Sequence, residues 1–222
     1  ARPYYLDLAE GFDAVVAHAG GSPAAKERFS QPGYPSIDGI GADGKYFTRE
    51  DFRQAPHNLY TSMERLLQGA AEQGFGDQDT FPSLLFSDSS ADIVGDETAK
   101  DIHIEYGPLY NVGYRYDSAM EQFTRFTQGE LHIDRETEQP LAIDNILVIK
   151  VPHQVLDDQG RRDIELDGSG EGWLFQQGFV QKVDWKYENG FTRPYKDGQE
   201  IPLIPGKTWV NVIPLDAEIH YK

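Results

Sequence analysis

The 222-residue sequence contains no cysteine. Disulfides, thiolate catalysis, iron–sulfur clusters and cysteine-ligated zinc are therefore excluded. No apolar run approaches the roughly 18–20 residues that a membrane-spanning helix needs. Positive charge is scarce, with 20 lysines and arginines against 37 aspartates and glutamates and a formal net charge of −17. Such a surface repels phosphate and anionic lipid, so neither nucleic acid nor the membrane surface is an expected partner.

Motifs for metals, phosphates and cofactors are missing as well. The acidic pairs Asp96-Glu97 and Asp157-Asp158 do not have the spacing of a calcium loop. The glycine-rich run 168–172 leads into the strand-like residues 173–175, whereas a phosphate-binding loop leads into a helix. We therefore expect a bulge or tight turn at this run, and neither a metal nor a cofactor.

The sequence does contain an α/β pattern followed by a β pattern. Its 39% hydrophobic and 26% charged residues are ordinary for a soluble globular chain of one large or two small domains. We predict an α+β fold, with an N-terminal α/β part that holds a mixed sheet (residues 1–100) and a C-terminal antiparallel β-rich part (residues 101–222). The polar, acidic segment 76–101 is the expected boundary or insertion, with Ser87–Asp92 as a surface loop.

A strand, a glycine turn and a helix follow one another near the start of the chain. The apolar segment Asp13–Ala19 predicts a strand that is covered on both faces. Pro23–Phe29 predicts a helix with Ser22 as its N-cap. Open α/β sheets bind ligands at such strand ends, where a helix N-terminus also presents free N–H groups.

This geometry makes His18 a candidate general base or ligand donor. Gly20, Gly21 and Ser22 are candidates for ligand binding at the same turn. The structural alternatives are a hydrogen bond from His18 to the loop backbone and simple helix capping by Ser22. Ser22 does not lie in a G-x-S-x-G nucleophile motif.

The clearest predicted helix is Thr61–Gln73. Thr61 and Glu64 form an N-terminal capping box, and Gly74 is placed to end the helix. The apolar residues at helical spacing are Met63, Leu66, Leu67 and Ala70.

A second polar corner, with His57, Asn58 and Tyr60, precedes this helix. His57 is a candidate catalytic base, and Asn58 and Tyr60 are candidates for binding a polar ligand. The structural alternative is that Asn58 caps a turn and His57 fixes the loop. We expect this corner and the His18 turn to share one pocket.

Carboxylates that would support a base are numerous. Asp7 and Asp134 are candidates for the orienting or acid partner of His18 or His57, and Arg2 is a candidate oxyanion or carboxylate clamp.

In two places a histidine and a carboxylate residue are two positions apart in the sequence. If these segments are strands, the two side chains of each pair lie on the same face. His103 with Glu105, or His132 with Asp134, could supply half of a metal site. No further metal motif accompanies them, so a cross-strand polar face is the expected explanation.

From residue 102 onward the alternation of apolar and polar residues predicts strands. The continuous apolar run Ile146–Val151 predicts a central strand. Turns that separate strands are predicted at Gln128-Gly129, Gln177-Gly178, Asn189-Gly190 and Asp197-Gly198. An antiparallel sheet or partly closed barrel follows from this spacing.

Several segments, in order, resemble the YerB-like family of bacterial lipoproteins of unknown function. They are ARPYY (1–5), HAGGSP (18–23), APHNLY (55–60), YRYD (114–117), HID (132–134), GSGEG (168–172) and PGKTWV (205–210). The resemblance implies an N-terminal α/β domain, a β-rich C-terminal part and an extracytoplasmic, membrane-anchored full-length protein. It also implies a preceding segment, with the signal peptide and the lipidated cysteine, that this chain lacks. The family contributes no catalytic residues.

Three functions remain open from the sequence. The first is a binding module for a polar cell-envelope ligand, either a glycan or a peptide. The second is a hydrolase of envelope polymers with a site built on histidine and aspartate. The third is a protein–protein adaptor that uses an exposed hairpin. Whether the chain is an enzyme, and its oligomeric state, are not determined by the sequence.

Overall fold

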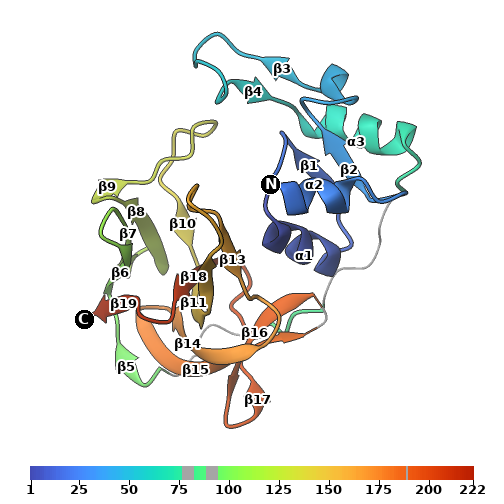
Figure 1. Cartoon of the computed structure of the whole chain (residues 1–222). Helices are drawn as coiled ribbons and strands as arrows, with labels where there is room; N and C mark the ends of the chain where they lie inside the picture. Colours follow the sequence, from blue (N-terminus) through green and yellow to red (C-terminus); the bar gives the residue numbers. More distant parts are fainter. Residues whose placement is uncertain (77–82, 89–94, 189) are drawn as a thin grey trace. The chain divides into compact units, whose positions relative to one another are not determined.

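The computed structural model describes residues 1–76, 83–88, 95–188 and 190–222 (Figure 1). The chain forms two compact units, residues 1–82 with 189–191 and residues 83–188 with 192–222. The sequence places the division near residue 100. In the structure the second unit begins at Ser83. Phe86 forms a bridge with Leu203 of this unit, and residues 97–98 pair with residues 179–180. Most of the predicted loop Ser87–Asp92 lies outside the described residues.

The first unit contains the helices and several short strands. In chain order these are α1 (Pro3–Gly11), β1 (Val16–His18), α2 (Pro23–Phe29), β2 (Ser36–Asp38), the 3-10 helix η1 (Gly44–Tyr46), β3 (Thr48–Arg49), β4 (Leu59–Tyr60) and α3 (Met63–Glu72). β1 and β2 pair in parallel with α2 as the crossover, and β3 and β4 form a separate antiparallel pair. The prediction of α2 and its Ser22 cap is confirmed, because Ser22 accepts a hydrogen bond from the Ala25 amide.

The first strand is shorter and more exposed than the sequence predicts. The predicted strand is Asp13–Ala19, covered on both faces, but β1 has three residues and Ala17 is exposed. Asp13 has a φ of 50°, which removes it from the extended region. Among the described strands β1 pairs with β2 alone, and so small a sheet cannot cover both faces of a strand.

Helix α3 confirms the predicted helix but not its predicted cap. Ser62, rather than Thr61, accepts a hydrogen bond from the Arg65 amide. The Thr61 hydroxyl instead donates to the Tyr46 carbonyl. The predicted end of the helix is confirmed at Gly74, whose φ of 76° is typical of a helix stop.

The apolar face of α3 is only partly covered. It lines a groove of about 600 Å³ together with Phe12, Val15 and Ile37. Met63 is 69% exposed and Leu67 is 59% exposed. The predicted amphipathic pattern is therefore present, but packing buries only part of it.

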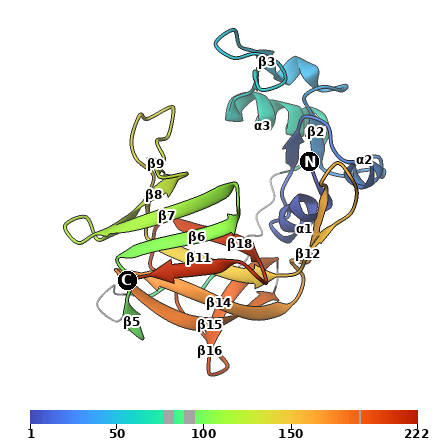
Figure 2. The same ribbon diagram turned by 60° about the vertical axis from the view of Figure 1, so that its left-hand side comes forward.

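The second unit is built of strands, which Figure 2 shows from a second direction. They are β5 (Glu97–Thr98), β6 (Asp101–Gly107), β7 (Tyr110–Asp117), β8 (Gln122–Thr127), β9 (Glu130–Leu131), β10 (Ala142–Ile143), β11 (Asn145–Val151), β12 (His153–Val155), β13 (Arg162–Ile164), β14 (Ser169–Gln176), β15 (Phe179–Glu188), β16 (Phe191–Lys196), β17 (Gln199–Glu200), β18 (Thr208–Pro214) and β19 (Glu218–Tyr221). A six-stranded sheet has the order β10-β8-β7-β6-β19, with β9 beside β8. A seven-stranded sheet has the order β17-β16-β15-β14-β11-β18, with β5 beside β15.

Strand β11 is central, as its apolar sequence predicts. It lies between β14, to which it is antiparallel, and β18, to which it is parallel. Its alternate residues face two clusters, so Ile146 packs in the cluster of Phe123 while Leu147 packs in the cluster of Trp185. Because Phe123 belongs to the six-stranded sheet, one of these clusters is the core between the two sheets. The predicted α+β class with a β-rich C-terminal part is confirmed.

The predicted turns of this unit are confirmed where they are described. Both residues have positive φ at Gln128-Gly129, Gln177-Gly178 and Asp197-Gly198, as the tight turns of right-twisted hairpins require. At the fourth predicted turn, Asn189 lies outside the described residues. The bulge or tight turn expected across the glycine-rich run 168–172 is wrong, because residues 169–172 lie in β14 and pair with β15 in unbroken register.

Candidate functional site

The parallel strands of the first unit bring His18 and Asp38 together. β1 ends at His18 and β2 ends at Asp38, and the two residues are register partners. The His18 Nδ1 atom lies 3.7 Å from an Asp38 carboxylate oxygen. The sequence predicts Asp7 or Asp134 as the partner of this histidine, but the structure places Asp38 beside it. Carboxyl ends of parallel strands are common ligand sites, so this corner is the first candidate.

The His18 ring, however, is enclosed. Its side chain is 7% exposed and stacks on Phe29, with ring centroids 3.7 Å apart. Among the described residues neither ring nitrogen has a hydrogen-bond partner. Burial lowers the pKa of His18, and the nearby Asp38 carboxylate and the Gly20 backbone oppose this effect only in part. The imidazole is therefore neutral at neutral pH, and its burial favours a packing role over proton transfer to a substrate.

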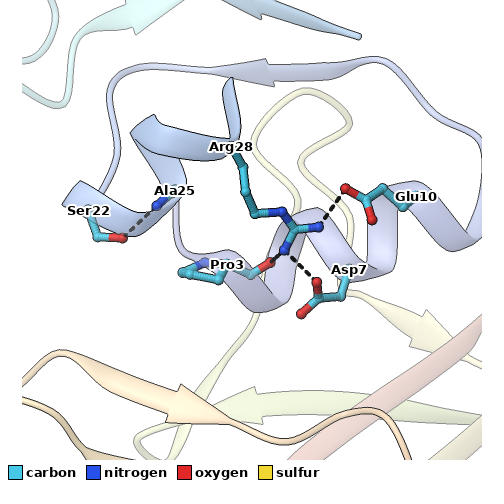
Figure 3. A network of polar contacts seen from close by, with 6 residues as sticks. All are labelled: Pro3, Asp7, Glu10, Ser22, Ala25 and Arg28. Atoms are coloured by element: carbon cyan, nitrogen blue, oxygen red, sulfur yellow. Dashed lines mark hydrogen bonds and ion pairs between the residues drawn. The ribbon is translucent and has the colours of Figure 1, made fainter. Parts of the chain in front are cut away.

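The other candidates at this turn serve the local fold. Figure 3 shows Ser22 at the start of α2, where its hydroxyl caps the helix through the Ala25 amide. Gly20 has a φ of 72°, and a Cβ atom on Gly21 would lie 3.2 Å from the Ala25 side chain. Arg2 donates a hydrogen bond to the carbonyl of the preceding residue. Backbone conformation, close packing and capping account for these residues without a ligand.

Asp7 takes part in an ion-pair network between two helices (Figure 3). Arg28 of α2 binds Asp7 and Glu10 of α1 through separate guanidinium nitrogens, each at 2.5 Å. It also donates to the Pro3 carbonyl at 3.3 Å. Arg28 thus ties α2 to α1.

The second predicted corner lies on the β3–β4 hairpin. His57 is exposed, and the Asn58 side chain accepts a hydrogen bond from Arg49 at 2.6 Å. The Tyr60 ring packs against a phenylalanine of the same hairpin. The pocket expected to be shared by this corner and the His18 turn stays a prediction.

Asp134 belongs to the second unit and stabilises a turn. Its carboxylate accepts hydrogen bonds from the Thr137 amide at 2.8 Å and the Thr137 hydroxyl at 2.9 Å. These bonds lower the pKa of Asp134. Ile133 forms an isolated bridge rather than part of a strand, so His132 and Asp134 do not form the predicted strand pair.

His132 instead belongs to a network around a buried arginine. Arg125 is 4% exposed and donates to the Thr127 hydroxyl at 2.6 Å and to His132 Nδ1. Its guanidinium carbon lies 4.4 Å from the centre of the Trp209 ring. Burial and the charge of Arg125 lower the pKa of His132, which keeps the imidazole neutral and able to accept this bond. The network lies in the sheet packing of the second unit.

A hollow of about 470 Å³ lies on the six-stranded sheet of the second unit. Its shape follows from the strand register, because His220, His103, Gly113 and Phe126 form one row across β19, β6, β7 and β8. Gly113 contributes no side chain to this row. The surface is therefore open between His103 and Phe126.

Charged groups stand beside the aromatic ring of this hollow. The Arg115 Nε atom lies 3.3 Å from an Asp101 carboxylate oxygen. The Arg115 guanidinium carbon lies 5.2 Å from the centre of the Phe126 ring. An aromatic ring, an ion pair and two imidazoles therefore line one cavity whose volume is within the usual range of small-ligand sites.

Sequence reasoning missed this hollow, although part of its signal is visible. The alternation at residues 101–107 and 110–117 places His103, Gly113 and Arg115 on strands, and His103 is already a candidate ligand. The row itself depends on the pairing of β19 with β6, whose residues are about a hundred positions apart in the chain.

Comparison with known proteins identifies the family. Residues 1–76 match the family described as "Protein of unknown function (DUF3048) N-terminal domain", and residues 102–210 match its C-terminal domain. The chain belongs to the DUF3048 family.

The DUF3048 chain is 40% identical over 222 residues to "Putative lipoprotein YerB" of Bacillus subtilis (strain 168), which confirms the resemblance inferred from sequence. The match covers 98% of this chain and 66% of the relative, so the chain spans about two thirds of that protein's length. The crystal structure of YerB from Bacillus subtilis aligns with a TM-score of 0.88 at 38% identity, covering 99% of this chain and 75% of that one.

The DUF3048 descriptions assign no function, and the name of the relative describes a lipoprotein. Within the described ranges, none of the helices has the length and apolar character needed to cross a bilayer.

Proposed function

We propose that this chain binds a neutral stretch of a cell-envelope glycan in the hollow of the six-stranded sheet. The observation that carries the proposal is the open row at Gly113, where an aromatic ring and the Asp101–Arg115 ion pair border one cavity. Sugar rings present apolar C–H faces and hydroxyl edges. An aromatic ring supports the first, and carboxylate and guanidinium groups hydrogen-bond the second.

Charge favours a neutral glycan over other envelope polymers. The formal net charge of −17 repels polymers rich in phosphate, as it repels nucleic acid. A peptide is the competing ligand, but extended peptides are usually bound by a sheet edge rather than by a hollow on a sheet face.

The proposed cellular setting is the outer side of the cytoplasmic membrane. It rests on the similarity to a protein named as a lipoprotein. In this setting the full-length protein is held by a lipid, and the chain described here is the part that meets the envelope polymers.

Hydrolysis is less well supported than binding. His18 is enclosed against Phe29, and the Ser22 hydroxyl is used to cap α2. A base and a nucleophile need to reach a substrate, and these two groups are directed to the protein itself.

The test is a titration of the chain with chitotetraose, a neutral oligomer of N-acetylglucosamine, followed by amide chemical shifts in the presence of EDTA. We expect shifts at residues around Gly113 and Phe126. Phe126→Ala is expected to weaken binding at least about tenfold. Phe52→Ala, which removes an exposed phenylalanine of the β3–β4 hairpin, is the control and leaves binding unchanged.

A second variant fills the hollow directly. A Cβ atom on Gly113 would lie 3.4 Å from the Ile102 carbonyl, an ordinary contact, and the β-branched side chain of Gly113→Val favours a strand. We expect this variant to fold and to lose binding. If a murein stem peptide binds and the oligosaccharide does not, or if Gly113→Val binds as well as the original chain, the proposal is wrong.

A further inference from the structure

The pairing of β19 with β6 brings together four polar side chains, two from each strand. His103 is the register partner of His220, and Glu105 is the register partner of Glu218. In β6 the neighbours Ile102 and Ile104 are buried and in β19 Ile219 is half-buried, while all four side chains are exposed. Two imidazoles and two carboxylates therefore occupy a two-by-two patch on one face of the sheet. We call these four residues the His-Glu patch.

Distances within the patch suit a shared ion. Each imidazole already lies beside the carboxylate of its own strand, 3.5 Å for His103 with Glu105 and 3.3 Å for His220 with Glu218. Residues directly opposite in an antiparallel pair have Cβ atoms about 4.5–5.5 Å apart. Two imidazole nitrogens that start from such positions can both reach an ion at metal–nitrogen bond lengths of about 2.0–2.1 Å.

The chemistry of the patch selects the class of ion. Imidazole and carboxylate ligands together suit zinc and its first-row neighbours, whereas calcium and magnesium prefer oxygen ligands alone. The protein's negative net charge also favours cations over anions at its surface. Within the described ranges no three such groups already converge as a metal centre, so binding requires these exposed side chains to rotate.

We propose that His103 and His220, together with Glu105 or Glu218, bind a divalent transition-metal ion such as Zn²⁺. His103 and His220 also line the 470 Å³ hollow, so a bound ion would lie at its border with coordination positions open to solvent. This site is additional to the proposed glycan binding and does not rest on it.

The experiment is a calorimetric titration of the metal-free chain with Zn²⁺ at neutral pH, with no glycan present. We expect one ion per chain. His103→Ala and His220→Ala are each expected to weaken binding at least about tenfold. His57→Ala removes an exposed histidine of the β3–β4 hairpin and is the matched control, so its isotherm should equal that of the original chain.

A second measurement locates the ion without relying on affinity. Paramagnetic Ni²⁺ should broaden the imidazole resonances of His103 and His220 before those of His57.

Two results would overturn the proposal: the absence of Zn²⁺ binding by the original chain, or an isotherm that the double variant H103A/H220A leaves unchanged. Circular dichroism of the variants shows whether they are folded, which is expected because both side chains are exposed. Phe126→Ala removes no ligand of the ion and should leave Zn²⁺ binding intact. The failure of one proposal is therefore distinguishable from the failure of the other.

Discussion

At the scale of single residues, the strand glycines Gly113 and Gly172 differ in the space around them. Neither has the positive φ that favours glycine. A Cβ atom on Gly172 would lie 2.7 Å from the Val148 carbonyl of the neighbouring central strand. A Cβ atom on Gly113 would make only ordinary contacts. Gly172 is therefore required by close packing of backbones, whereas the strand leaves room for a Cβ atom at Gly113.

Gly172→Ala is expected to destabilise the chain by about 1–3 kcal/mol, because the new methyl group forces β14 away from β11. Urea unfolding followed by tryptophan fluorescence measures this change. Gly76→Ala is the control, since nothing lies within 4 Å of its added Cβ atom, and its effect should stay within about 0.5 kcal/mol. Equal stability of the two variants would contradict the packing argument.

At the scale of elements, helix α3 shows how neighbouring hydroxyls compete for one role. Thr61 and Ser62 are both good N-cap residues, and only the first has a glutamate three positions later. The Thr61 hydroxyl is taken by the Tyr46 carbonyl, so the helix begins one residue later with Ser62 as its cap. A tertiary contact thus overrides a local capping motif.

Ser62→Ala should reduce the free energy of unfolding of the first unit by about 1 kcal/mol, because the Arg65 amide loses its acceptor. Thermal unfolding followed by circular dichroism at 222 nm checks this value. Glu64→Ala, which removes the acceptor of the predicted capping box, should change stability by only a few tenths of a kcal/mol, about the size of a helix-dipole contribution. The reverse order of the two effects would show that Thr61 and Glu64 cap the helix after all.

At the scale of the whole molecule, partly buried histidines link stability to pH. Burial lowers the pKa values of His18, His132 and His153, and it is the largest cause in each case. The folded chain therefore binds these protons less readily than the unfolded chain does. Stability is fully present above the unfolded pKa of about 6.5 and is lost as the pH falls from there toward the lowered folded values.

We expect the urea midpoint to decrease between about pH 7.5 and pH 5.5. His132→Gln should reduce the size of this decrease, since it removes one of the three groups. Glu72, whose pKa the neighbouring Lys45 and Tyr46 lower to about 2, remains charged in the folded chain throughout this range and does not contribute to it. A midpoint that is constant or rises on acidification would contradict the assignment of neutral, enclosed imidazoles.

The sequence by itself determined the α+β class, the helix at Pro23–Phe29, the central strand β11 and the described glycine turns. These depend on local periodicity, capping and φ preferences, which are properties of neighbouring residues. Tertiary structure decided that Asp38, and not Asp7, stands beside His18, and that β19 lies against β6. A parallel crossover and long-range strand register bring these residues together. Such pairings leave no periodic signal in the sequence, because the pairing energy is spread over many residues that lie far apart in the chain.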